Sequence, residues 1–333
     1  MTQVMDQVKF SRLIPTGSAT VYAAEFKRGN QYVYALWTAD GEQKAKLQFK
    51  QKAQGILTEM LGKESKVAAD VLDIEITESP AYLTLNVPIQ NIMPDGNRSF
   101  KKHNKELKEK LGSQKVYSIA LDSKDQLKVV PGRDARLEFN HTPNPVSMGL
   151  RSAGNYELQN INDAEKGQCV AIRLLPASEP VKTPLMSEYG VFRLNEPIVL
   201  PGKPTTIGAE VYGNSSWGKF FWELEDADGE IWLSAGSTGY GCNVHDWPDK
   251  AGFSFDGWKT MAFPIAKESP ITVYAPGENE WQWQHAGSNG DNQITYPVKL
   301  KGIAVALNRK SLVLKDMQDV EPVVKIKSIS VWE

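Results

Sequence analysis

Apolar and polar residues alternate in short runs along most of the chain, and turn residues separate the runs. Residues 20–49 carry three such runs, with a Gly-Asn pair at 29–30 and an Asp-Gly pair at 40–41 between them. Alternation with a period of two is typical of β-strands, and glycine supplies the positive φ that a tight hairpin turn needs. We therefore expect three strands joined by two hairpins, and further short strands that complete a small antiparallel β-sandwich over residues 1–87.

The pattern changes in residues 88–115. The first part contains a Pro-Asp-Gly turn at 94–96 and is expected to be a loop, whereas residues 99–111 are predicted to form a helix that Ser99 caps. Residues 98–115 hold seven Lys or Arg and two Glu, and their one Phe, Tyr or Trp residue, Phe100, falls on the predicted apolar face, so aromatic rings do not alternate with the charges. A connector helix with a solvated basic face is therefore favoured over an anion or nucleic-acid site. The face predicted to be buried comprises Phe100, Asn104, Leu107 and Leu111.

Residues 116–333 repeat the strand pattern on a larger scale. The Asp-Gly pair at 228–229 lies between two alternating runs and predicts a hairpin. The parity of the apolar positions switches at Gly302, which indicates a β-bulge. Gly208 and Gly213 leave their strand with little bulk, which indicates close packing of sheets or a bulge. Many short strands with almost no helix predict a sandwich of the jelly-roll type.

Composition narrows the classes of function. The net charge is −2, so the chain has no global basic field for nucleic acid. No apolar run near the N-terminus has the length of a signal peptide, and none elsewhere approaches the roughly 20 residues that cross a bilayer. We expect no membrane span, and a periplasmic or extracellular location if the chain belongs to a longer exported protein. Cys169 and Cys242 are too few for a disulfide framework, so free buried thiols are favoured over a bridge between them.

Crowded carboxylates invite a catalytic interpretation. Glycoside cleavage commonly uses an acid and a base or nucleophile on opposite sides of the bond, so a jelly-roll glycosidase or lyase that uses an acidic pair or His285 is one alternative. Two of the carboxylates share one face of a predicted strand and two frame its turn, and the simplest interpretation is a solvated strand face with a hairpin tip. The five residues are Glu223, Glu225, Asp226, Asp228 and Glu230.

Metal and nucleophile motifs are weak. The stretch 226–229 lacks the third ligand and the distant bidentate Glu of an EF-hand loop. We expect no cofactor, while a structural calcium ion stays open because scattered ligands would leave no motif. Cys242 and His245 are close in sequence, but no oxyanion donor accompanies them, and His245 with Asp246 is an equally weak metal pair. No GxSxG, HExxH or P-loop motif is present.

Aromatic residues in polar loops give the most specific prediction. A sugar presents a flat apolar C–H face and a rim of hydroxyls, so proteins bind it with an aromatic platform and a few fixed polar side chains. Two predicted loops hold that combination, and in an extended segment the rings of Trp281 and Trp283 would face the same side. The predicted carbohydrate-binding residues are Trp217, Tyr240, His245, Trp247, Trp281, Trp283, His285, Asn289 and Asp291.

The other tryptophans of this region have a different expected role. They lie in predicted strands, where a large ring packs in the core or between sheets. For the loop tryptophans, anchoring of the loop or packing against another domain is the alternative to contact with a ligand. The predicted core tryptophans are Trp222, Trp232, Trp258 and Trp332.

The first region resembles the small β-sandwich that follows the catalytic barrel in large bacterial polysaccharide-degrading glycoside hydrolases. The resemblance lies in an aromatic strand that ends in Leu-Trp-Thr, a later Leu-Gly and a closing Ser-Pro-x-Tyr-Leu, with Glu59 where the pattern has Asp. The matching residues are Leu36, Trp37, Thr38, Leu61, Gly62, Ser79, Pro80, Tyr82 and Leu83.

The second region is similar to the galactose-binding-like jelly rolls appended to such enzymes, on the order of its segments GAEVYG, WELEDADGE, DGWKTMAFPI, KGIAVAL and KIKSISVWE. The resemblance implies two antiparallel sandwiches in an accessory, non-catalytic role. Such enzymes carry their catalytic glutamates in a (β/α)₈ barrel of about 250 residues. No alternating strand–helix pattern of that kind is present, so no catalytic residue is carried over.

The sequence therefore predicts an all-β chain that binds polysaccharide or oligosaccharide through the loops of a C-terminal jelly roll. Its expected partners are glycans and a glycoside hydrolase catalytic module. A purely structural module that braces a catalytic domain or a partner chain is the other alternative.

Overall fold

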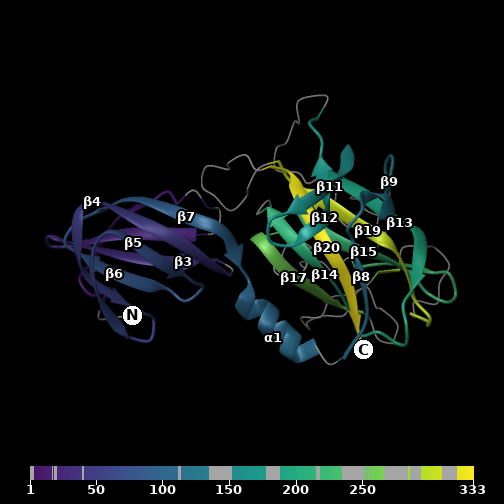
Figure 1. Ribbon diagram of the computed structural model, residues 1–333, viewed down its shortest axis with the longest axis horizontal. Coiled ribbons are helices and arrows are strands. Elements are labelled where there is room, and N and C mark those ends of the chain that lie inside the picture. The colour runs from purple at the N-terminus through teal and green to yellow at the C-terminus, as the bar shows by residue number, and fades with distance from the viewer. Residues whose placement is uncertain are drawn as a thin grey trace. The chain divides into compact units, whose positions relative to one another are not determined.

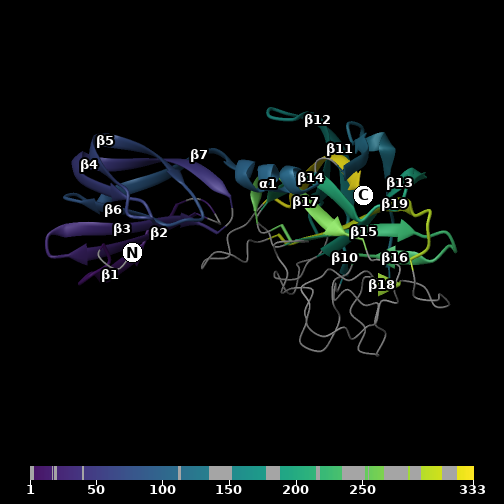
Figure 2. The same cartoon turned by 90° about the horizontal axis from the view of Figure 1, so that it is seen from below.

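The computed structural model shows an all-β protein with one α-helix in the part of the chain that it describes (Figures 1 and 2). The chain divides into two compact units. The first comprises Met1–Lys105 with Phe255–Trp258, and the second comprises Glu106–Ser254 with Lys259–Glu333. The structure describes residues 4–16, 18, 21–39, 41–111, 114–134, 152–177, 188–214, 218–234, 252–253, 255–265, 284–285, 294–309 and 321–333.

The first unit is built on one seven-stranded antiparallel sheet in the order β1-β2-β3-β6-β4-β5, with β7 paired to β4. Strand β4 is long enough to pair with β7 through its first half and with β6 through its second half. The two parts of the sheet enclose a core that includes Tyr34, Leu36, Leu47 and Leu83. The strands are β1 Lys9–Leu13, β2 Val21–Arg28, β3 Gln31–Thr38, β4 Glu42–Thr58, β5 Glu64–Ile76, β6 Ala81–Leu85 and β7 Ile89–Ser99.

One of the two predicted hairpins in this unit is confirmed. Strands β2 and β3 pair directly, and Gly29 between them has a φ of +58°. The hairpin predicted at 40–41 is wrong, although Gly41 does have a φ of +74°. Strand β6 lies between β3 and β4 in the sheet, so the chain crosses to a non-adjacent position after β3. A local turn signal is satisfied equally by a hairpin and by such a crossing.

Residues 88–99 are not the predicted loop. Most of them form β7, which pairs with β4 from Ile89 to Ser99, including Pro94. The apolar Ile89 and Ile92 are buried in the core, and this burial outweighs the Pro-Asp-Gly signal. The predicted helix is confirmed as α1 Lys101–Leu111, with Leu111 buried and most of its lysines exposed.

The second unit contains two sheets. One has the order β10-β13-β19-β15-β16-β18, with β9 on β13, and the other has the order β11-β12-β20-β14-β17, with β8 on β20. Their strands are β8 Lys115–Ala120, β9 Leu127–Val130, β10 Ser152–Ala153, β11 Tyr156–Asp163, β12 Gly167–Leu174, β13 Glu188–Val199, β14 Thr206–Asn214, β15 Lys219–Glu225, β16 Ile231–Leu233, β17 Asp256–Pro264, β18 Gln284–His285, β19 Lys299–Leu307 and β20 Val323–Trp332. A 3₁₀ turn, η2 Lys124–Gln126, precedes β9.

Aromatic side chains fill the space between the two sheets. Trp222 and Phe220 of β15 meet Phe263 of β17 with ring centroids 5.8 and 5.9 Å apart. Tyr156 of β11 meets Phe192 of β13 edge to face at 5.5 Å. The core role predicted for four tryptophans is confirmed, because each is at most 6% exposed: Trp222, Trp232, Trp258 and Trp332.

The glycine signals of this unit are also confirmed. Gly229 has a φ of +83° at the tip of the β15–β16 hairpin. The register between β15 and β19 shifts at Gly302, where the bulge was predicted. An added Cβ at Gly208 would lie 2.6 Å from the Met261 carbonyl oxygen, so β14 and β17 approach closely there. A bulge follows between Glu210 and Val211.

Candidate functional site

The sheet that contains β15 carries buried apolar side chains on both faces. Trp222 points toward the other sheet, so by strand alternation Phe221 and Glu223 lie on the opposite side, which we call the outer face. A second hydrophobic cluster is buried on the outer face and includes Tyr189, Phe221, Leu233, Ala304 and Ala306. The continuous burial of β15 is typical of a strand covered on both sides.

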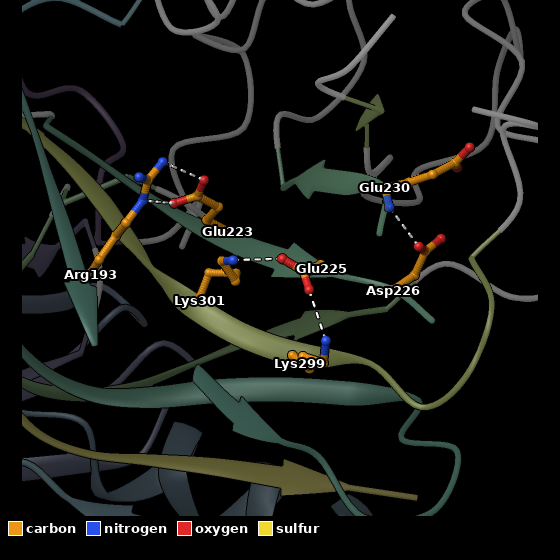
Figure 3. Close-up of polar contacts among 7 residues, drawn as sticks. All are labelled: Arg193, Glu223, Glu225, Asp226, Glu230, Lys299 and Lys301. Carbon is orange, nitrogen blue, oxygen red and sulfur yellow. Dashed lines mark hydrogen bonds and ion pairs between the residues drawn. The ribbon is translucent and has the colours of Figure 1, made fainter. Parts of the chain in front are cut away.

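A buried ion pair crosses the outer face (Figure 3). Arg193 of β13 and Glu223 of β15 are both in register with Gly302 of β19. Arg193 donates from Nε and Nη2 to the two Glu223 carboxylate oxygens, each at 3.0 Å. The Glu223 side chain is 3% exposed, and a bidentate guanidinium is the geometry that compensates a buried carboxylate best.

A second charged group lies beside this pair on the same face. Glu225 accepts hydrogen bonds from Lys299 Nζ at 2.8 Å and from Lys301 Nζ at 2.5 Å (Figure 3). These two ammonium groups lower the pKa of Glu225 below its ordinary value of 4.5. Glu225 is therefore ionised over the whole neutral range and is a poor proton donor.

The lowered pKa predicts how acid acts on this group. A carboxyl whose pKa falls on folding stabilises the protein above its unfolded pKa, and that stabilisation disappears as the pH falls through the folded pKa. We expect Glu225→Gln to lower the free energy of unfolding by less than about 1 kcal/mol at pH 7, because the lysines are partly solvated. The difference from wild type should shrink as the pH approaches 3. Urea unfolding at pH 7, 5 and 3 measures it, and a difference that grows on acidification would contradict the lowered pKa.

Asp226 is fully buried at the end of β15 and organises the hairpin turn. Its Oδ1 accepts hydrogen bonds from the backbone N–H groups of Asp228 at 3.1 Å and Glu230 at 2.8 Å. Its Oδ2 accepts from Trp232 Nε1 at 3.0 Å and from the Thr295 N–H at 3.4 Å. The carboxylate thus fixes the turn, the core tryptophan and the segment that enters β19.

The predicted solvation of the acidic cluster is therefore wrong for two of its members. Glu223 is 2% exposed and Asp226 is 0% exposed, and both carboxylates are hydrogen-bonded on both oxygens. Only Asp228 at the tip is exposed. The sequence did not disclose the partners, because Arg193, Lys299 and Lys301 come from other strands. The available signal was the presence of cations inside an apolar run, one in VFRLN and two in VKLKG.

Most of the predicted carbohydrate-binding residues lie outside the described residues. His285 is placed by its backbone in β18, where it pairs with Trp232 of β16. The others lie outside the described residues, and the structure describes the points where their segments join the sheet. The eight residues are Trp217, Tyr240, His245, Trp247, Trp281, Trp283, Asn289 and Asp291.

Three of these segments join the sheet on the side toward which β15 begins, at positions between Gly218 and Trp222. Trp217 directly precedes Gly218, whose carbonyl oxygen accepts a hydrogen bond from the backbone N–H of Phe253 at 2.8 Å. The segment 235–251 starts after Ser234, whose N–H donates to the Trp222 carbonyl, and it returns at Gly252, which bridges to Lys219. That segment holds Tyr240, His245 and Trp247.

The third segment ends at β18. Gln284 pairs with Leu233, so the chain that carries Trp281 and Trp283 arrives beside the point from which segment 235–251 departs. Adjacent strands are about 4.8 Å apart, so Ser234 and Trp283 follow on from neighbouring backbone positions. The segment 286–293, with Asn289 and Asp291, returns to the sheet at the opposite end, where Ala227 N–H donates to the Thr295 carbonyl.

The described residues give no support for a metal site, a reactive thiol or a membrane-spanning helix. Among the described residues, no group of three or more His, Cys, Asp or Glu side chains could hold a metal ion. Cys169 is a buried free thiol, as predicted, and burial raises its pKa, whereas Cys242 lies outside the described residues. In the described part of the chain, no helix combines the length and apolarity needed to cross a membrane.

Comparison with known proteins places the chain in no family. No protein-family model matches it, and no curated protein sequence matches it. Among solved structures it is similar to a β-porphyranase of glycoside hydrolase family 86 from the human gut bacterium Bacteroides plebeius, with 10% identity and a TM-score of 0.19 over 96% of this chain. The chain spans 37% of the length of that enzyme.

Two plant proteins give likenesses of the same kind. The coconut allergen cocosin has 8% identity and a TM-score of 0.14 over 98% of this chain and 84% of its own. Vicilin from hazelnut, Corylus avellana, has 9% identity and a TM-score of 0.12 over 97% of this chain and 84% of its own. Scores this low carry no argument about fold or function, so the function must be argued from the residues.

Proposed function

We propose that this chain is a non-catalytic carbohydrate-binding protein, or the accessory part of a glycoside hydrolase, whose second unit binds glycan by aromatic stacking. One observation supports the proposal above the others. The segments that carry Trp217, Trp247 and Trp283 join the sheet at the same end of β15, β16 and β18. The segments that carry Trp247 and Trp283 leave neighbouring strands beside Trp222, and the segment that carries Trp217 meets β15 four residues away at Gly218, about 14 Å along the strand. Such an arrangement is compatible with a composite platform built from three distant parts of the sequence.

The chemistry of these segments suits a sugar. Aromatic rings stack on the apolar C–H face, and imidazole, amide and carboxylate groups fix the hydroxyls. The described acids favour binding over cleavage, because Glu223 and Glu225 are each hydrogen-bonded to cationic side chains of other strands. The proposal needs no cofactor, and it places the protein in the periplasm or outside the cell, where polysaccharides are met.

Binding to a panel of plant and host polysaccharides tests the proposal. Sites of this shallow kind bind with a Kd of roughly micromolar to millimolar, which affinity electrophoresis and calorimetry can measure. We expect Trp247→Ala and Trp281→Ala each to weaken binding about tenfold, because each removes a stacking surface. Neither substitution should change the thermal unfolding temperature by more than a few degrees.

The matched control is Trp37→Ala in the first unit. Trp37 is half-buried and its ring stacks on that of Tyr22 with centroids 5.2 Å apart, so its loss removes a comparable surface far from the predicted site in sequence. Glycan binding should be unchanged in this variant. The proposal fails if no polysaccharide binds, or if the two loop variants change stability alone.

A further inference from the structure

Three cations and two carboxylates form a compact charged group on the outer face of the β15 sheet. Arg193 belongs to β13, Glu223 and Glu225 belong to β15, and Lys299 and Lys301 belong to β19 (Figure 3). Four hydrogen bonds, all between 2.5 and 3.0 Å, join the cations to the carboxylates. Among these five side chains one positive charge is left over.

The carboxylates of this group are more deeply buried than the cations. The carboxylate side chains are 3% exposed at Glu223 and 19% exposed at Glu225. The cations reach solvent, with side chains exposed to 35% at Arg193, 39% at Lys299 and 25% at Lys301. A molecule that approaches the outer face therefore meets positive groups first, and the acids beneath hold those groups in place.

The cations also keep unused hydrogen-bond donors. A guanidinium carries five N–H groups and an ammonium carries three. Arg193 uses two of its N–H groups on Glu223, and each lysine uses one on Glu225. Fixed, partly desolvated donors of this kind bind an anion more strongly than mobile surface lysines do, because less side-chain entropy is lost.

The register relates this group to the predicted glycan site. Arg193, Gly302, Glu223, Leu233 and Gln284 are successive partners across five strands. Glu223 and Gln284 are thus two strand spacings apart, about 10 Å. Trp283 directly precedes Gln284 in the sequence, so the chain that carries it meets the sheet at a distance from Glu223 that a short oligosaccharide can span.

We propose that Arg193, Lys299 and Lys301 form a subsite for an anionic group of the glycan, so that the ligand is an acidic polysaccharide bearing sulfate esters or carboxylates. This inference rests on the proposed function and specifies its substrate class. The shared chemistry is an oxyanion on a sugar ring, received by the spare N–H donors of the three cations.

Matched pairs of polysaccharides test it. Carrageenan before and after desulfation reports on sulfate, and polygalacturonate before and after methyl esterification reports on carboxylate. We expect the wild-type protein to bind the charged member of at least one pair at least tenfold more tightly at about 50 mM salt, a condition under which screening is moderate. The pair that shows the difference identifies the anion.

Two variants change the charge in opposite directions. Lys299→Gln/Lys301→Gln should lower affinity for the charged polysaccharide about tenfold and leave binding of the neutral form unchanged. Glu225→Gln should raise affinity for the charged form, because it frees both ammonium groups. The control Lys101→Gln/Lys108→Gln removes the same charge from exposed positions of α1 and should change Kd by less than about twofold.

The outcomes separate this inference from the proposed function. If the α1 control loses as much affinity as the cluster variant, binding reflects general charge and the subsite is wrong. If charged and neutral members bind equally, the subsite is wrong but the proposed function stands. If none of the four polysaccharides nor the wider panel binds, the proposed function and the subsite fall together.

Discussion

Replacing Asp226 with alanine is expected to destabilise the second unit by about 4 kcal/mol, because the loss of a buried, hydrogen-bonded carboxylate is among the most costly single changes. Four donors lose their acceptor at once: three backbone N–H groups and Trp232 Nε1. Trp232 and Asp226 are both 0% exposed, so water cannot replace the carboxylate without opening the core. For a unit of this size the change corresponds to a fall in melting temperature of roughly 10 °C.

Tryptophan fluorescence during urea unfolding measures the effect, since seven of the nine tryptophans belong to the second unit. The control is Asp228→Ala two residues away, whose carboxylate is exposed and accepts one side-chain hydrogen bond, from Thr295 Oγ1 at 2.8 Å. It should cost less than about 1 kcal/mol. Asp226→Asn should fall between the two, because its Oδ1 still accepts the turn N–H groups while its amide opposes Trp232 Nε1. Equal effects of the two alanine substitutions would show that Asp226 does not hold the turn.

Replacing Gly302 with alanine is expected to cost about 3 kcal/mol, the upper end of the usual range for overpacking. The added Cβ would lie 2.2 Å from the Phe192 carbonyl oxygen and 2.8 Å from the Cα of Arg193. Both obstacles are backbone atoms, which no rotamer change moves, so β13 and β19 must separate. That separation also strains the Arg193–Glu223 pair that crosses β19 at this glycine.

Gly229→Ala is the control for this substitution. Gly229 has a φ of +83° but nothing within 4 Å of an added Cβ, so alanine there meets backbone strain alone, about 1 kcal/mol. The melting temperatures of the two variants, measured by near-ultraviolet circular dichroism, compare the cost of a steric clash at Gly302 with the cost of backbone strain at Gly229. If Gly302→Ala melts at or above the temperature of Gly229→Ala, the two strands do not meet as closely as the structure places them.

Local signals in the sequence were sufficient where the outcome depended on neighbours along the chain. The positive φ at Gly29 and Gly229 and the bulge at Gly302 all follow from backbone chemistry at one position. Helix α1 was predicted from its cap and its period, and the core tryptophans from their place in strands. Each of these features is decided within a few residues.

Strand pairing depended on residues far apart in the sequence. The turn at Gly41 predicts a hairpin, yet β6, which begins forty positions later, takes the place beside β3. The β7 segment read as loop because Pro and Gly interrupt it, yet its isoleucines gain more from burial than the turn signal offers. Pairing is a non-local choice, made by whichever register buries the most apolar surface.

The sequence by itself determined that this is an all-β chain and which tryptophans are buried in its strands. Only the tertiary structure decided that Glu223 and Glu225 are paired with Arg193, Lys299 and Lys301, and that three distant segments join the sheet between Gly218 and Trp222 of β15. The physical reason is the same in both cases. Both features depend on which strands become neighbours in the sheet. The hydrogen-bond register between distant strands decides which strands are neighbours, and the residue pattern within a single strand does not specify that register.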